Sequence, residues 1–209
     1  EHLFGTGTTC GWASRFHPRA RKDLFFVLDA GWAEEGKESA GTGDVLNLTK
    51  FAQFKSTGNA GALKKLNDAV VAQGWRGAGL WFGDFASSKG NITQRALESK
   101  YAGIRYWKVD FCADARGVTA CSLANLAKSV HPELIVEHGC PESGFPSFIP
   151  FNTGPGGRFD VTAINVWAPM LQCSDVFRTY DTAGALSISQ TLDRVQALLQ
   201  VSARLIGDD

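Results

Sequence analysis

Apolar runs suited to buried strands alternate with stretches of helical periodicity, and this alternation constrains the fold more than any other feature of the chain. Strands are expected at residues 24–28, 78–82, 104–111, 134–136, 159–166 and 175–178, and helices at 59–73, 93–101, 122–130 and 187–205. Strands separated by helices pair in parallel, because each helix carries the chain back to the end of the sheet from which the preceding strand started. The sequence therefore predicts an α/β protein with crossover helices.

Acidic residues stand where several of the expected strands end: Asp29, Asp84, Asp110 and Glu137. In a (β/α)8 barrel, the carboxyl ends of the strands form the face that carries the active site. An Asp after a strand is also an ordinary cap or turn residue. Their succession along the chain favours a shared pocket as much as it favours four separate turns.

The segment Tyr106-Trp107-Lys108-Val109-Asp110-Phe111-Cys112 carries the sharpest chemical pattern. Lys108 and Asp110 are two residues apart on an expected strand, so both side chains point to one face. A lysine and an aspartate inside a barrel are costly to bury unless they are paired or used in chemistry. Taken by itself, the pattern slightly favours a purely structural pair at a strand end.

This segment resembles the nucleophile strand of the α-galactosidase-type glycoside hydrolases, families 27 and 36 of the melibiase-like clan. Further similar segments follow in the same order, and together they cover nearly the whole chain: Cys10-Gly11-Trp12 as the first barrel strand, Leu28 to Trp32, residues 67–82, Glu137, Gly156 to Asp160, and Phe177 to Asp181. The resemblance implies one catalytic TIM (β/α)8 barrel over residues 1–209.

The resemblance also implies a retaining double displacement on a terminal α-linked galactose or a related sugar. Asp110 would be the nucleophile and Asp181 the acid/base, with Asp175 as the rival for the second role. Arg178 would orient a sugar hydroxyl or the acid. The remaining substrate-binding candidates are Lys108 and Asp29 for ring hydroxyls, Trp12, Trp32 and Trp81 as stacking platforms, and Asp84 and Glu137 at strand ends. Two carboxyl groups fill both roles, so we expect no metal and no organic cofactor.

Three features depart from the family pattern. Ala30 stands where the family has a second Asp that helps hold the galactose hydroxyls, and the spacing from Arg178 to Asp181 is one residue shorter than in many members. The chain has 209 residues, whereas a full barrel typically has about 250. With six or seven strands identified, we expect a barrel truncated before its last strands.

Charge balance, hydropathy and cysteine content bear on which partners and which compartment are expected. Lys+Arg and Asp+Glu balance at 21 each, which gives no electrostatic reason to expect nucleic acid, and no apolar run of about 18 residues predicts a membrane span. Five cysteines without zinc-finger spacing are compatible with one disulfide, two or none. We expect a carbohydrate partner, and an oligomer is compatible with the sequence. By resemblance alone, the compartment is secreted, periplasmic or lysosomal.

Three other functions fit parts of the same pattern. A transglycosylase would pass the galactosyl group to a sugar acceptor from the same intermediate. A catalytically silent carbohydrate-binding or assembly subunit would account for Ala30 and for the missing C-terminal portion. An unrelated barrel enzyme would use Lys108 and Asp110 for proton transfer at a carbonyl, and borohydride trapping of a Schiff base would reveal it.

Overall fold

A computed structural model of the protein describes residues 3–6, 9–34, 45–82, 92–109, 118–139 and 172–178. The chain divides into two compact units. The first comprises Glu1–Phe82, Gly90–Lys108 and Leu126–Ile135, and the second comprises Gly83–Lys89, Val109–Asn125 and Val136–Asp209. Within the described part of the chain, no helix combines the length and the hydropathy needed to cross a membrane.

The α/β prediction is confirmed, because parallel strands alternate with helices along the described chain. The strands of the larger sheet are β3 (Phe25–Leu28), β4 (Gly77–Phe82), β5 (Tyr106–Val109), β6 (Ile135–Gly139) and β7 (Val176–Arg178). Their hydrogen-bonded order is β3-β4-β5-β6-β7, and β3 pairs with β4, and β6 with β7, in parallel. A closed eight-stranded barrel remains an expectation.

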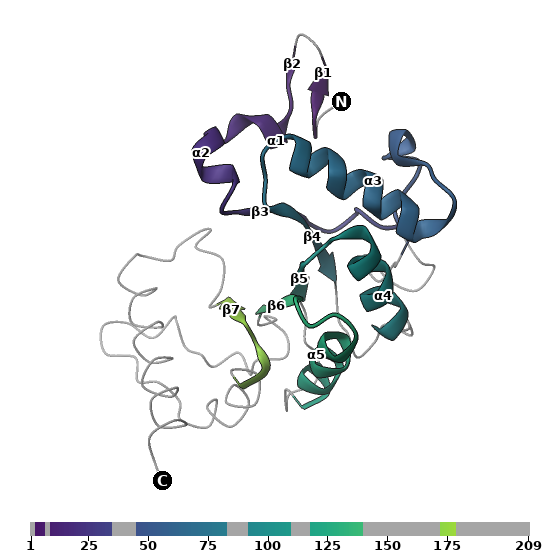
Figure 1. Cartoon of the computed structure of the whole chain (residues 1–209), viewed down its shortest axis with the longest axis vertical. Coiled ribbons are helices and arrows are strands. Elements are labelled where there is room, and N and C mark those ends of the chain that lie inside the picture. The colour runs from purple at the N-terminus through teal and green to yellow at the C-terminus, as the bar shows by residue number, and fades with distance from the viewer. Residues whose placement is uncertain are drawn as a thin grey trace, which may run out of the picture. The chain divides into compact units, whose positions relative to one another are not determined.

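The predicted helices occur within a few residues of the expected bounds: α3 (Gly58–Ala72), α4 (Ile92–Ala102) and α5 (Val118–Val130). Gly74 and Gly103 follow α3 and α4 with φ of 87° and 72°, a conformation that glycine adopts without a steric cost. Helix α3 packs against α4 and β4, as Figure 1 shows. The expected strand at 159–166 and helix at 187–205 lie outside the described residues.

One buried side chain ties α3 to the sheet and to α4. The amide of Asn67, 6% exposed, accepts from the backbone N–H of Ala78 at 2.8 Å and donates to the carbonyl of Ala102 at 3.0 Å. Both partners are buried backbone groups, which are costly to leave unpaired. Asn67 therefore fixes the start of β4 and the end of α4 against the same turn of α3.

The N-terminal segment departs from the prediction. Cys10-Gly11-Trp12 was expected to form a barrel strand, but β1 (Gly5–Thr6) and β2 (Thr9–Cys10) make a separate antiparallel pair, and Trp12 begins the short helix α1 (Trp12–Arg15). A Cβ on Gly11 would lie 2.2 Å from the Gly5 nitrogen, so only glycine allows the chain to fold back this closely. Two further short helices, α2 (Pro18–Arg21) and η1 (Ala52–Phe54), were not expected.

Candidate functional site

The two sides of the sheet in the first unit differ in chemistry. On one side, the rings of Phe25 and Tyr106 lie 5.2 Å apart, and a Cβ built on Gly79 would meet the side chains of Val27 and Tyr106 at 3.0 and 3.2 Å. On the other side, Trp107 contacts Phe82 and its indole N–H donates to the Ser99 hydroxyl of α4 at 3.0 Å. The first side is therefore the face that turns away from α4.

Lys108 lies on that face, because it follows Tyr106 by two residues on β5. Its ammonium nitrogen lies 2.9 Å from Oδ2 of Asp29, the residue directly after β3. The Lys108 side chain is only 14% exposed, whereas that of Asp29 is 66% exposed. The sequence named both residues, and the structure brings them together across two strands that are not neighbours in the sheet.

The loop after β3, which begins with Asp29, turns sharply at Gly31. The backbone N–H of Ala30 donates to Oδ1 of Asp29 at 2.9 Å, and Gly31 has a φ of 89°. The Lys50 ammonium donates to the Gly31 carbonyl at 3.1 Å. The sequence did not predict this contact, because a lone lysine 19 residues beyond Gly31 carries no local signal of it.

The three tryptophans named as sugar platforms have different surroundings. Trp32 and Trp81 are 3% and 4% exposed, so their ring faces are covered by protein. Trp12 is 58% exposed, and the guanidinium carbon of Arg15 lies 4.5 Å from its ring centroid. Sugar stacking on these rings stays a prediction, and of the three only Trp12 presents a large exposed surface.

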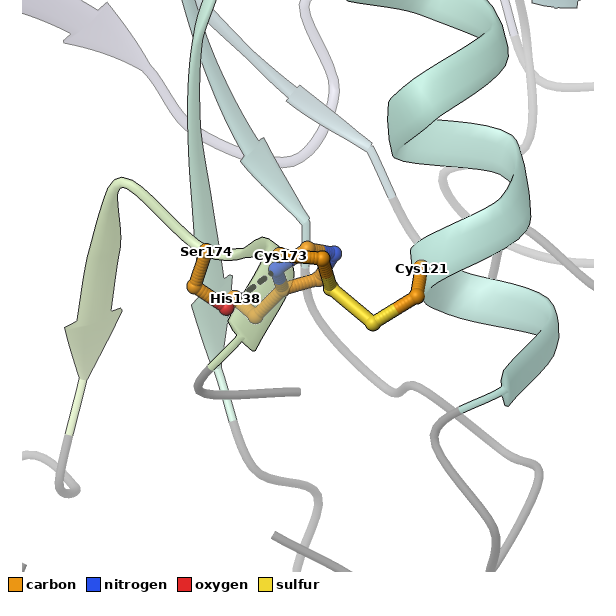
Figure 2. Close-up of a disulfide and its surroundings, with 4 residues drawn as sticks. All are labelled: Cys121, His138, Cys173 and Ser174. Carbon is orange, nitrogen blue, oxygen red and sulfur yellow. Dashed lines mark hydrogen bonds between the residues drawn. A yellow bond between two sulfur atoms is a disulfide. The ribbon is translucent and has the colours of Figure 1, made fainter. Parts of the chain in front are cut away.

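In the second unit, Glu137 lies inside β6 rather than after the strand, since β6 extends to Gly139. Its neighbour His138 is buried and contacts the Ser174 hydroxyl through Nδ1 at 2.7 Å (Figure 2). Glu137 and His138 point to opposite faces of β6 because side chains alternate along a strand. Arg178 is the last residue of β7 and pairs with Gly139 in the register of the two strands.

Asp175 directly precedes β7 and therefore lies at the amino end of that strand. Its backbone N–H donates to the Val136 carbonyl at 3.0 Å, and its Oδ2 accepts from the Val136 N–H at 2.7 Å. This reciprocal pair extends the β6–β7 ladder by one step. The carboxylate of Asp175 thus has a structural partner at the end of the strand opposite to the one where barrel active sites form.

A disulfide joins the same segment to α5. Cys121 of α5 and Cys173 form this disulfide, as Figure 2 shows, and the two cysteines are 52 positions apart in the sequence. The sequence allowed one disulfide, two or none, and it gave no pairing, because connectivity depends on which cysteines the fold brings within reach.

Asp84, Asp110 and Asp181 lie outside the described residues. Where the structure does describe the chain, no three His, Cys, Asp or Glu side chains gather closely enough to hold a metal ion. The arrangement that is described, an ammonium donor and a largely exposed carboxylate acceptor 2.9 Å apart, offers charged hydrogen-bonding groups to a polyhydroxylated ligand.

No protein-family model, no curated protein and no solved structure matches the chain.

Proposed function

We propose that this chain is the catalytic barrel of a retaining glycoside hydrolase that cleaves a terminal α-linked galactose or a closely related sugar. The observation that carries the proposal is the Lys108–Asp29 pair, on the face of the sheet that turns away from α4 and at the end of the strand that precedes Asp110. A mostly buried ammonium is retained at such a place when its charge is paired or used.

Asp110 follows Lys108 by two residues, and the period of two along a strand predicts that both side chains share one face. In the proposed reaction, the Asp110 carboxylate attacks the anomeric carbon and the leaving oxygen takes a proton from the acid/base. Water, activated by the same acid/base, then releases the sugar from Asp110. Lys108 and Asp29 hydrogen-bond ring hydroxyls and hold the sugar for the attack.

The surroundings of Asp175 support Asp181 as the acid/base. The Asp175 carboxylate accepts a hydrogen bond from the β6 backbone at the amino end of β7. Asp181 follows Arg178, the residue that closes β7 at its carboxyl end. A (β/α)8 barrel fold, a carbohydrate ligand, and a secreted, periplasmic or lysosomal compartment belong to the same proposal.

The test is hydrolysis of a panel of aryl α-glycosides by the protein and by its Asp110→Ala variant. The panel contains the α-galactoside, the α-N-acetylgalactosaminide and the α-glucoside, and the aryl β-L-arabinopyranoside is assayed beside them. We expect release from one substrate, a loss of about 10³-fold or more in kcat/KM for Asp110→Ala, and a product that retains its anomeric configuration by NMR.

Asp175→Asn is the matched control, because it removes a carboxylate that the structure assigns to the β6–β7 ladder. We expect Asp175→Asn to lower thermal stability and to leave kcat/KM within about threefold of the parent value, whereas Asp181→Asn lowers kcat severely. Activity that survives Asp110→Ala would refute the proposal. Sugar binding without any turnover would identify the chain as a binding subunit.

A further inference from the structure

The Asp29 carboxylate lies in a short exposed turn. Strand β3 ends one residue earlier at Leu28, Asp29 and Ala30 are exposed, and Gly31 adopts a φ of 89°. A short exposed turn of this kind samples several conformations unless other contacts restrain it. Described contacts restrain this turn at Ala30, whose N–H donates to Asp29, at Gly31, whose carbonyl accepts from Lys50, and one residue further along at Trp32.

Trp32 is 3% exposed, and its indole N–H donates to the carbonyl of Trp81 at 2.5 Å. Trp81 lies one residue beyond Leu80, the last residue of β4 that pairs with β3. The indole therefore connects the turn to β4 just past the end of the backbone ladder. The carbonyl of Trp32 also accepts from the Asn47 N–H at 2.9 Å, which fixes the turn from its other side.

The Trp32 ring continues into a row of aromatic contacts that reaches β5. Trp32 meets Phe82 edge-to-face with ring centroids 5.7 Å apart, and Phe82 meets Trp107 in the same manner at 4.8 Å. The Trp107 indole donates to Ser99 of α4. Trp107 immediately precedes Lys108 on β5, and Trp32 follows Asp29 by three residues. The aromatic row, Trp32–Phe82–Trp107, therefore lies on the opposite face of the sheet from Lys108 and is connected to the ion pair through the backbone of β5 and of the turn after β3.

We infer that Trp32, acting through the aromatic row, is a positioning residue that sets the distance between the Asp29 carboxylate and the Lys108 ammonium. Its covered ring faces argue against direct stacking on a sugar, because a platform must present a face to its ligand. Close-packed aromatic contacts transmit a displacement of one backbone segment to the next. The consequence for catalysis rests on the proposed function, whereas the effect on the ion pair does not.

Trp32→Phe tests the inference, because it keeps an aromatic ring in the row and removes the N–H donor. The matched control is Trp75→Phe. Trp75 is 5% exposed, and its indole donates to the Ala13 carbonyl at 2.7 Å, a bond of the same kind away from the aromatic row. We expect the two variants to lose similar thermal stability, since each loses one buried indole–carbonyl bond.

The first readout is a double-mutant cycle of Asp29→Asn and Lys108→Met, measured by urea unfolding in each background. The cycle gives the coupling between Asp29 and Lys108, expressed as a factor in the unfolding equilibrium constant. We expect this factor to be about fivefold or more in the parent and in Trp75→Phe, and less than about twofold in Trp32→Phe. The second readout is kcat on the responsive glycoside, which should fall about tenfold in Trp32→Phe and stay within twofold in Trp75→Phe.

Unchanged coupling of Asp29 and Lys108 in Trp32→Phe would overturn the inference, whatever the activity. Lost coupling in a protein without glycosidase activity would support the positioning role and reject the proposed function. If Trp32→Phe does not fold, Trp107→Phe takes its place, because it keeps an aromatic ring and removes the bond to Ser99 at the other end of the aromatic row. The same loss of coupling is expected.

Discussion

Replacing Asn67 by alanine should destabilise the protein more than any replacement of an exposed asparagine. The amide makes two hydrogen bonds to backbone groups, at 2.8 Å to the Ala78 N–H and at 3.0 Å to the Ala102 carbonyl. Ala78 and Ala102 are 0% and 2% exposed, so water does not readily replace the lost partner. A buried backbone group left unpaired costs about 1–3 kcal/mol, which gives about 2–6 kcal/mol for the two.

Stability is measured by urea unfolding monitored by tryptophan fluorescence, and by thermal unfolding. In a chain of this size, a loss of about 3 kcal/mol corresponds to about 6–12 °C in Tm. Asn47→Ala is the control. The Asn47 side chain also makes two backbone bonds, to the N–H groups of Thr49 and Lys50, but both bonds are exposed. We expect that control to cost about 1 kcal/mol or less.

Equal losses in Asn67→Ala and Asn47→Ala would refute the reasoning, because burial of the partners is the only difference it relies on. A loss for Asn67→Ala with a changed denaturant slope would mean that the substitution alters the extent of the folded structure instead. Asn67→Asp adds a check, since it keeps the acceptor for Ala78 and places a negative charge against the Ala102 carbonyl. It should cost at least as much as the alanine variant.

Other parts of the structure give further predictions. Reduction of the Cys121–Cys173 disulfide, or its replacement by two serines, should lower the free energy of unfolding by about 4 kcal/mol, the chain-entropy estimate for a separation of 52 residues. Urea unfolding with and without reductant measures the loss, and a loss below about 1 kcal/mol would contradict that estimate. Gly79→Ala should lower the free energy of unfolding by about 1–3 kcal/mol in the same assay, because its Cβ would lie 3.0 Å from Cγ2 of Val27 and 3.2 Å from Cβ of Tyr106. No measurable loss would mean that β3 and β5 move apart freely. Lys108→Met should abolish the effect of Asp29→Asn on sugar affinity, measured by calorimetry, because each residue holds the other in place; additive effects of the two substitutions would contradict a functional pair.

The order and type of the elements could be predicted because they depend on local patterns. The continuous apolar run before Asp29 gave β3, and helical periodicity closed by Gly74 and Gly103 gave α3 and α4. The prediction was wrong at Cys10-Gly11-Trp12. An apolar aromatic after a glycine is compatible with a strand, but close packing of Gly11 on Gly5 and the bond from Trp75 to the Ala13 carbonyl make this segment a turn followed by a helix. Such contacts join residues up to 62 positions apart, and local propensity does not contain them.

For the candidate site, the sequence by itself determined which residue types stand at the strand ends and which of them share a face. Lys108 and Asp29 followed from the period of two along a strand and from the end of an apolar run. Only the tertiary structure decided that Lys108 reaches Asp29, that Trp32 is covered and holds the turn, and that the Asp175 carboxylate belongs to the β6–β7 ladder. The physical reason is that strand pairing brings together segments far apart in the chain, and the register of that pairing is set by the packed core as a whole.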